Sequence, residues 1–240
     1  MLQITDYTGA DQYDQCLHCA RKLDAKPTRD HVPSLGLLAS PYPDNLPTVD
    51  ICPECNNGFS DDERYLFLLL DCVLSGSADP NDQPDPRVAE RLGKAPGLAR
   101  RIADQQVLTL PLDVETVWWQ PESARINTVI VKNARGHVMY ETGVPLHRQP
   151  DSVAFSALSI LTAEQRQAFE RGADDSAHGV LLPEVGTRAL ARAFTPDVVD
   201  GWVVVQTSRY RFAVDTGDSA VRVRSVIREY LATETIWCLD

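Results

Sequence analysis

The sequence lacks a long hydrophobic run, a basic N-terminal region and an excess of positive charge. No stretch of about 18 uncharged apolar residues occurs, which excludes a transmembrane helix of ordinary length. The N-terminus, MLQITDYTGADQYDQ, has neither the basic region nor the apolar segment of a signal peptide. With 43% hydrophobic and 24% charged residues, the composition is that of a globular protein. We therefore expect a cytoplasmic protein with no membrane partner.

Positive charge is scarcest in the N-terminal part of the chain. The net charge of the whole chain is −11. Residues 1–80 contain thirteen Asp and Glu against five Lys and Arg, a net of −8, whereas residues 81–240 carry only −3. Because proteins gain most of their affinity for nucleic acid by neutralising phosphates with Lys and Arg, this distribution argues against a nucleic-acid partner for the N-terminal segment.

The six cysteines include two closely spaced pairs, at residues 16–19 and 52–55, each of the form C-x2-C. A tight turn with this spacing presents two sulfurs to one ion. The 32 residues between the pairs must then form a structured loop. Disulfides or a redox pair are the alternatives, but a chain without an export signal is expected to use such thiolates for metal. We predict a structural Zn2+ ion held by Cys16, Cys19, Cys52 and Cys55, which leaves Cys72 and Cys238 as buried or free thiols.

Composition and capping signals predict two domains. The first 59 residues are rich in Pro, Asp, Asn and Cys, which is typical of a loop-rich module held together by metal. Ser60 and Glu63 form a capping box that predicts a helix from there to about Ser75. Three prolines and three aspartates at residues 78–86 indicate a linker. We therefore predict a zinc-binding module over residues 1–77, a linker at 78–86 and a second domain over 87–240.

The second domain is predicted to contain both helices and strands. Residues 87–106 indicate two short helices separated near Pro96. Apolar residues recur every four positions over residues 126–142, which favours a helix there over a strand. Thr162 caps a further helix that runs to about Arg171, and residues 184–194 indicate another. The last forty residues alternate in polarity and predict an antiparallel β-meander, so the expected fold class is α+β.

The loop between the cysteine pairs carries further short motifs. It reads RDHVP at residues 29–33 and DNL at residues 44–46, and Asn56 and Asn57 follow the last cysteine. In this order the motifs resemble the HNH endonuclease family, whose members have a zinc-supported ββα-metal fold. The resemblance covers residues 16–73. The whole chain is also similar to bacterial proteins in which a zinc-bearing HNH-like head precedes a larger tail.

The family resemblance assigns roles in phosphodiester hydrolysis to these residues. Cleavage needs a general base that activates water and a divalent cation that polarises the phosphate. The resemblance implies that His31 is the base, that Asp30 binds the catalytic ion, expected to be Mg2+, and that Asn45 orients His31. Asn56 would complete the metal site, with Asn57 as the alternative. These roles would make the chain a metal-dependent nuclease acting on DNA or RNA.

Two departures from the family pattern favour a different function. Many family members carry Lys or Arg shortly after the asparagine, whereas here the sequence continues as NGFSDDE, which is neutral and then acidic. The capping box also predicts that the helix begins after Ser60, which would leave Asn56 outside it. The alternative is a non-catalytic interaction or regulatory protein with a degenerate HNH-like head, whose acidic surface binds a basic protein partner.

The second domain has no enzyme motif of its own. No Gly-rich phosphate loop, G-x-S-x-G or H-E-x-x-H occurs after residue 80. Spacing of i, i+2 on the meander places two pairs of arginines on common faces that can bind phosphate, namely Arg209 with Arg211 and Arg222 with Arg224. The alternative is that these arginines pair with Asp215, Asp218, Glu229 and Glu234 on a solvated face. The four tryptophans are expected in the core or at a domain interface.

Overall fold

The computed structural model describes residues 14–23, 27–109, 116–171, 198–217 and 219–239. The chain groups into two compact units, one formed by residues 1–58 and 130–240 and the other by residues 59–129. Helix α1 (Pro53–Ser75) and helix α4 (Ser123–Thr142) each run from one unit into the other. The predicted linker at residues 78–86 lies inside the second unit. Its role as a boundary between independently folding segments stays a prediction.

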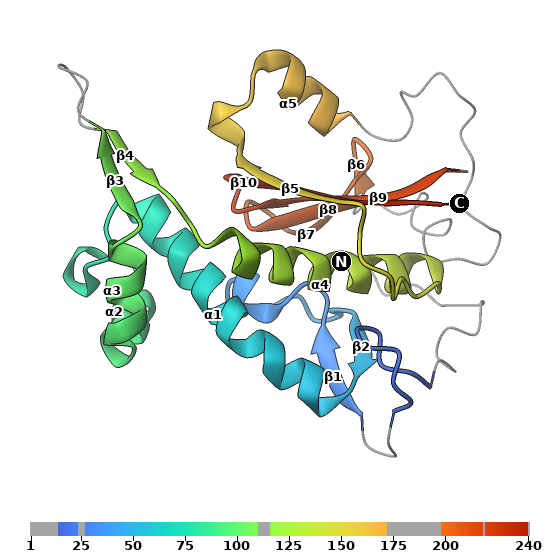
Figure 1. Ribbon diagram of the computed structural model, residues 1–240. Helices are drawn as coiled ribbons and strands as arrows, with labels where there is room; N and C mark the ends of the chain where they lie inside the picture. Colours follow the sequence, from blue (N-terminus) through green and yellow to red (C-terminus); the bar gives the residue numbers. More distant parts are fainter. Residues whose placement is uncertain (1–13, 24–26, 110–115, 172–197, 218, 240) are drawn as a thin grey trace. The chain divides into compact units, whose positions relative to one another are not determined.

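The larger unit contains a six-stranded antiparallel sheet with the strand order β5-β10-β9-β8-β7-β6 (Figure 1). Its strands are β5 (Ser152–Ala157), β6 (Val198–Val199), β7 (Trp202–Gln206), β8 (Tyr210–Thr216), β9 (Ala220–Ile227) and β10 (Leu231–Cys238). Strands β7 to β10 neighbour one another in the sheet in the order in which they follow in sequence. This arrangement confirms the predicted meander and the α+β fold class.

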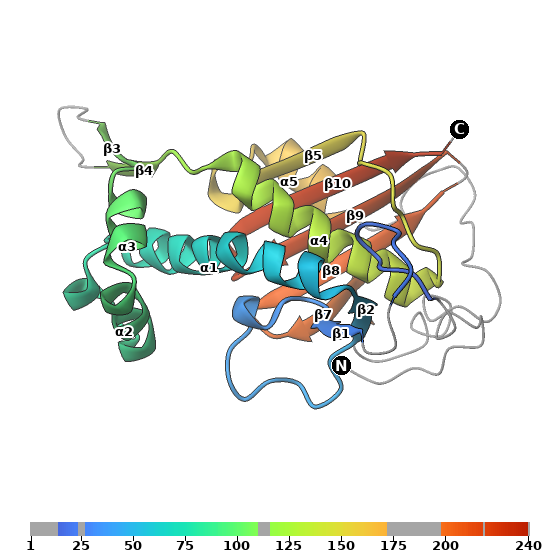
Figure 2. The same cartoon turned by 60° about the horizontal axis from the view of Figure 1, so that its bottom comes forward.

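Different helices cover the two faces of this sheet (Figures 1 and 2). On one face, Ala134 and Val138 of α4 pack with Trp237 of β10 in a buried cluster. On the other face, Phe169 of helix α5 (Ala163–Glu170) packs against Trp202 of β7. The alternation of side chains along each strand supplies both clusters from the same strands. The sheet is therefore the middle layer of its unit.

Both helices were predicted from the sequence. Helix α4 includes the whole of residues 126–142. Helix α5 has the expected capping box, in which the Thr162 side chain accepts from the Gln165 backbone N–H and the Gln165 side chain accepts from that of Thr162. A short 3-10 helix, η4 (Leu158–Ile160), precedes α5. The helix predicted at residues 184–194 lies outside the described residues.

The N-terminal segment of the larger unit forms a ββα arrangement. Strand β1 (Thr28–His31) pairs with β2 (Thr48–Ile51) in an antiparallel hairpin, and α1 follows β2 directly. A 3-10 helix, η2 (Leu35–Leu37), lies in the connection between the strands. Val49 of β2 is buried and pairs with Asp30, whereas Thr48 is exposed and pairs with His31. One face of the hairpin is therefore in the core and the other is open.

Helix α1 begins at Pro53, so the predicted start after Ser60 is wrong. Proline is well suited to the first helical position, because its missing N–H has no partner there in any case and its φ angle is already helical. Glu54 adds a favourable negative charge in the first turn. The Asn56 backbone N–H donates to the Cys52 carbonyl at 3.1 Å. Asn56 therefore lies inside the helix, contrary to the sequence-based expectation.

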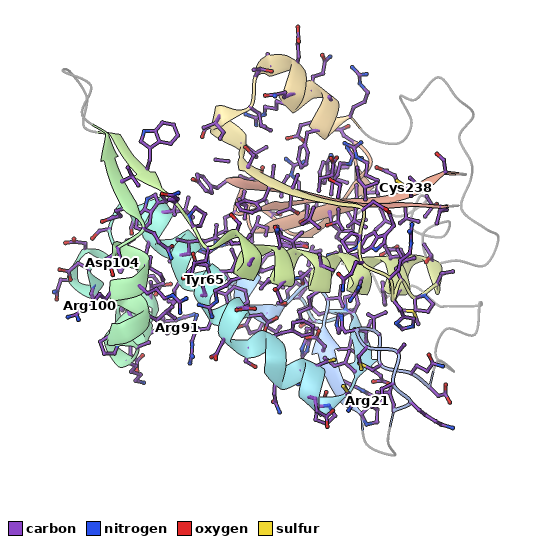
Figure 3. The ribbon with its side chains drawn as sticks, viewed as in Figure 1. Arg21, Tyr65, Arg91, Arg100, Asp104 and Cys238 are labelled. Atoms are coloured by element: carbon purple, nitrogen blue, oxygen red, sulfur yellow. The ribbon has the colours of Figure 1, made fainter. Side chains whose placement is uncertain are left out.

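The second unit contains the remainder of α1, three short helices and a hairpin. Its elements are η3 (Pro80–Asp82), α2 (Pro86–Lys94), α3 (Pro96–Ala103), β3 (Gln106–Thr109) and β4 (Thr116–Trp119). The break between α2 and α3 falls at Ala95, as predicted from the proline that follows it. The Tyr65 hydroxyl of α1 donates to Gln105 at 2.7 Å and accepts from the Glu122 backbone N–H at 2.8 Å (Figure 3).

Trp118 does not lie in the core, which was one of the two places expected for the four tryptophans. This residue is 48% exposed on β4, opposite Val107 of β3, which is 40% exposed. A two-stranded hairpin has too few strands to bury both of its faces, which accounts for the exposure. Trp202 and Trp237 are buried, as expected. Among the described residues, no helix combines the length and apolar character needed to span a membrane.

The close approach of α4 to the N-terminal hairpin predicts the effect of a single methyl group. A Cβ atom added at Gly136 would lie 2.7 Å from a methyl carbon of Val32, which is itself buried. Gly136→Ala is therefore expected to lower the free energy of unfolding by about 1–3 kcal/mol, despite the better helix propensity of alanine. Gly58→Ala is the matched control, because a Cβ atom there meets nothing within 4 Å and should raise stability by about 0.5–1 kcal/mol. Urea unfolding of both variants measures the difference, and a stabilising Gly136→Ala would contradict this packing.

Candidate metal centre

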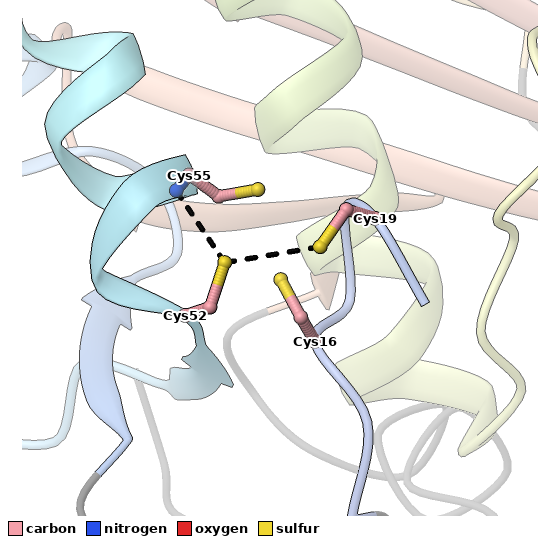
Figure 4. Close-up of side chains that lie close together, drawn as sticks. All are labelled: Cys16, Cys19, Cys52 and Cys55. Carbon is pink, nitrogen blue, oxygen red and sulfur yellow. Dashed lines mark hydrogen bonds between the residues drawn. The ribbon is translucent and has the colours of Figure 1, made fainter. Parts of the chain in front are cut away.

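The four predicted cysteine ligands converge in the larger unit (Figure 4). Cys16 and Cys19 lie in the N-terminal segment, Cys52 lies between β2 and α1, and Cys55 is in the first turn of α1. The four sulfur atoms all lie within 4.8 Å of one another, and the sulfurs of Cys19 and Cys52 are 3.8 Å apart. The cluster is thus placed to hold a metal ion.

The distance between the sulfurs of Cys19 and Cys52 matches that expected around a single tetrahedrally coordinated ion. Metal–sulfur bonds of about 2.3 Å place the sulfurs of a tetrahedral site about 3.8 Å apart. The separation between Cys19 and Cys52 has this value. A disulfide would require about 2.05 Å, and all six cysteines are free. Of the alternatives considered from the sequence, the structure therefore favours metal over disulfides.

A short turn in the N-terminal segment presents the first two sulfurs. The Cys16 backbone N–H donates to the Arg21 carbonyl at 2.7 Å, and the Ala20 N–H donates to the Cys16 carbonyl at 2.9 Å. Ala20 has a φ of 58°, in the left-handed region that a tight reversal of the chain requires. Around the cluster, Leu17 and Met139 belong to the same buried core as Cys16. This core shields Cys16 and Cys52 from water, whereas Cys19 is exposed and Cys55 is half-buried.

The cysteine thiols differ in acidity because their surroundings differ. Burial opposes ionisation of Cys16, but hydrogen bonds from the backbone N–H groups of Cys52, His18 and Cys19 outweigh burial and lower its pKa to about 7. Burial raises the pKa of Cys55 well above its usual value, and the neighbouring sulfurs act in the same direction. A bound metal ion requires thiolates, so loading of the centre releases protons and depends on pH.

Asp30, the predicted ligand of a catalytic ion, is already paired with a cation. The buried ammonium group of Lys132 in α4 donates to an Asp30 carboxylate oxygen at 2.8 Å and to the Ser34 hydroxyl at 2.9 Å. His18 approaches the other carboxylate oxygen only to 4.0 Å. Burial, followed by the charges of Lys132, Arg135 and His147, lowers the pKa of His18 to about 3, so His18 is neutral. Lys132 is therefore the cation that neutralises Asp30.

The other predicted catalytic residues do not gather around Asp30. Successive side chains of a strand point to opposite faces, so Asp30 faces the core and His31 faces the open side of the hairpin. Asn45 is exposed, and among the described residues no hydrogen bond joins it to His31. Asn56 is half-buried in α1. Within the described parts of the chain, the four cysteines form the one group of three or more His, Cys, Asp and Glu side chains placed to hold a metal ion.

Polar residues of α4 that the sequence interpretation passed over contact the N-terminal module. Lys132, Asn133 and Arg135 are all less than 7% exposed. The Asn133 side-chain oxygen accepts from the Ser34 backbone N–H at 2.8 Å. The sequence does contain a signal for these contacts. The polar segment KNAR lies between apolar residues of the same helix, which indicates that its side chains are buried. Buried polar residues in such a helix require partners on the element packed against it.

The arginines of the meander are engaged with acidic residues. Arg224 is fully buried and bonds to Asp215 at 2.8 Å, and Arg222 pairs with Glu234. Arg211 forms ion pairs with Glu170 and Glu229. Arg209 is exposed beside β8, and Asp218 lies outside the described residues. The pairing alternative considered from the sequence therefore describes Arg211, Arg222 and Arg224 in this structure.

Comparisons of the chain with models of protein families, with curated proteins and with solved structures gave no significant match. Arguments about function therefore rest on the chemistry and geometry of the site itself.

Removal of one cysteine ligand tests whether the cluster binds metal. Cys52→Ser is expected to reduce the metal content of the purified protein from about one ion per chain to almost none, because a structural site needs all four ligands. Cys238→Ser is the matched control, because Cys238 is exposed at the end of β10 and outside the cluster (Figure 3). Elemental analysis by mass spectrometry provides the measurement. Equal metal content in both variants would remove the cluster from consideration as a metal site.

The pairing of Lys132 with Asp30 predicts strong coupling between the two side chains. Lys132→Met and Asp30→Asn should each lower the free energy of unfolding by about 3 kcal/mol or more, because each leaves a buried group without its partner. The double variant should lose clearly less than the sum of the two. Lys94→Met is a control on an exposed pair with Glu90 and should cost less than about 1 kcal/mol. Additive losses in chemical denaturation would contradict a direct ion pair.

Proposed function

We propose that this chain is a non-catalytic zinc-binding interaction protein, in which one Zn2+ ion is held by Cys16, Cys19, Cys52 and Cys55 and has a structural role. The observation that carries this proposal is the position of Asp30, which pairs with buried Lys132 on the side of β1 away from His31. The ββα head retains the order of elements that the HNH resemblance implies, but its acidic residue serves the contact with α4.

The donor set supports zinc as the ion. Four thiolates in a closed, tetrahedral arrangement are typical of structural zinc sites, which have no open position for substrate. Soft sulfur ligands disfavour Mg2+ and Ca2+, which prefer oxygen. A reducing compartment such as the cytoplasm keeps such thiols available, and this agrees with the free state of all six cysteines.

The surroundings of Asp30 argue against hydrolysis of phosphodiesters. A one-metal mechanism needs the ion and the general base on the same phosphate. Here the Lys132 ammonium group lies 2.8 Å from the carboxylate, so a divalent cation bound at Asp30 would meet a like charge. His31 lies on the opposite face of the strand, and within the described parts of the chain it belongs to no group of side chains placed to bind metal. His31 and Asp30 therefore face opposite sides of β1 and cannot act together on one phosphate.

The charge of the N-terminal module supports a basic protein partner. Residues 1–80 carry a net charge of −8, and Asp44 and Asp50 are exposed in the connection before β2 and in β2 itself. Such a surface repels phosphates and attracts Lys-rich or Arg-rich segments. The ion pairs of Arg211 and Arg222 leave the meander with less free positive charge for nucleic acid than its sequence indicates. Binding to a basic peptide that weakens steeply with salt is the expected behaviour.

A metal-dependent nuclease is the second candidate. It is favoured by the ββα order of β1, β2 and α1, by the half-buried position of His31 at the end of β1, and by the place of Asn56 in α1 close to the metal centre. For this function Lys132 would have to leave Asp30 before an Mg2+ ion could bind there. The HNH resemblance then supplies the expected roles, with His31 as base and Asn45 as its orienting residue.

A cleavage assay distinguishes the two functions. The zinc-loaded protein is incubated with Mg2+ or Mn2+ and with single-stranded and double-stranded DNA and RNA, beside a His31→Ala variant of equal zinc content. We expect no cleavage by the wild type beyond that of the variant, because no described site brings His31 and a divalent-ion ligand together. Divalent-ion-dependent cleavage that disappears in His31→Ala with zinc retained would overturn the non-catalytic proposal and establish the second candidate.

A further inference from the structure

Arg135 is a buried cation whose charge has no carboxylate partner. The residue lies on α4 and is 6% exposed. Its guanidinium donates to the backbone carbonyls of His147 at 3.0 Å, Arg148 at 2.9 Å and His18 at 3.4 Å. In the described parts of the chain it forms no ion pair with Asp or Glu. Backbone carbonyls satisfy hydrogen bonds, but they do not cancel a full positive charge.

One donor of this guanidinium is also without an acceptor. The Nε–H group of Arg135 is buried, and it has no hydrogen-bond partner among the described residues. Such a group is costly to bury unless something negative is nearby. Burial lowers the pKa of Arg135, as expected for a guanidinium group removed from water. The geometric link from Arg135 to the cysteine cluster is its contact with the carbonyl of His18, which lies between Cys16 and Cys19.

The metal-loaded cluster needs a positive charge of this kind. Four thiolates and one Zn2+ ion together carry two formal negative charges. Cys16 is fully buried and Cys52 is 5% exposed, so part of this charge is removed from water. Arg21, labelled in Figure 3, is exposed. It forms an ion pair with Glu54, and Lys132 forms one with Asp30. Among the described residues, Arg135 is a buried cation that contacts the segment between Cys16 and Cys19 and has no acidic partner.

We propose that Arg135 is the buried counter-charge of the zinc-loaded cysteine cluster and that it couples zinc binding to the attachment of α4. The proposal deepens the structural role given to zinc above and rests on it. Arg135 touches the segment between the first two cysteines through the His18 carbonyl. It also holds the Arg148 carbonyl, to which the indole N–H of Trp237 in β10 donates at 3.2 Å. Loss of zinc is therefore expected to weaken contacts that extend to the sheet.

This coupling differs from an ordinary structural role in its dependence on metal. If Arg135 serves the loaded cluster, Arg135→Gln removes a favourable charge from the zinc form but relieves the metal-free form of a buried cation. By linkage, the difference between the stability changes of the zinc form and the metal-free form must then appear as a loss of zinc affinity of the same size. A side chain that only ties down carbonyls would destabilise both forms equally and leave zinc affinity unchanged.

The experiment measures zinc affinity and stability for the full chain. Competition with a chromophoric chelator should show that Arg135→Gln weakens zinc binding by about tenfold or more, the usual effect of losing a group that supports metal ligands. Arg135→Lys, which keeps the charge, should recover part of the affinity. Thermal unfolding should show a lower Tm for the zinc-loaded Arg135→Gln variant and a smaller change, or none, for its metal-free form.

Arg224→Gln is the matched control for loss of a buried arginine. Arg224 is fully buried on the sheet face that α5 covers, and it pairs with Asp215 rather than with the cluster. Its substitution should reduce Tm while changing the zinc dissociation constant less than about twofold, since it lies outside the metal surroundings. Equal zinc affinity in Arg135→Gln and the wild type would overturn the proposal. Nucleic-acid cleavage in the preceding assay would instead overturn the non-catalytic function and leave this affinity measurement unaffected.

Discussion

The burial of two positive charges on one turn of α4 is the constraint on which the N-terminal module depends. Lys132 is 3% exposed and Arg135 is 6% exposed, so neither can rely on water for its hydration. In the N-terminal module, the Asp30 carboxylate neutralises Lys132. On our proposal, a zinc-loaded thiolate cluster neutralises Arg135. A buried cation needs an opposite charge beside it, so the two cations favour packing of the N-terminal module against the face of α4 on which they lie. Gly136 permits that approach, since Val32 occupies the space of a side chain there.

The pairing of Asp30 with Lys132 also explains why a ββα arrangement like that of HNH nucleases need not carry their catalytic chemistry. The hairpin and α1 follow the ββα order implied by the HNH family, yet function depends on which face of β1 each side chain occupies. The inward carboxylate of Asp30 is used to hold a lysine, while the outward imidazole of His31 is half-exposed. In this structure Asp30 and His31 therefore do not share the surface that a base and a metal ion need. The cysteine cluster does not use this surface, because none of its four residues belongs to β1.

Local sequence signals predicted the elements well, because their causes are local. The capping box at Thr162, the break before Pro96 and the alternation of the meander all appear where they were expected. The convergence of the cysteines was also predictable, since two C-x2-C pairs have the spacing of metal ligands. The start of α1 was missed because Ser60 and Glu63 match a capping box, whereas Pro53 directly after a cysteine is equally able to begin a helix.

The partners of charged residues could not be predicted in the same way. Asp30 and Lys132 are separated by 102 positions, and nothing in the sequence near either residue indicates the other. The arginines of the meander were a partial exception, because their acidic partners lie on neighbouring strands and in the turn beside them. Arg211 also uses Glu170 of α5, which only the packing of that helix on the sheet reveals. Ion pairs between residues far apart in sequence thus determine which charged side chains of the candidate site are free to bind a ligand.

Anomalous diffraction from crystals grown with both Zn2+ and Mn2+ is the most direct test of this account. Manganese stands in for Mg2+ and can be distinguished from zinc at its absorption edge. The account predicts a zinc peak about 2.3 Å from each of the four sulfurs and no manganese peak beside Asp30, whose carboxylate remains bound to Lys132. A manganese ion coordinated by Asp30, with Lys132 displaced, or a zinc-free cysteine cluster would contradict it.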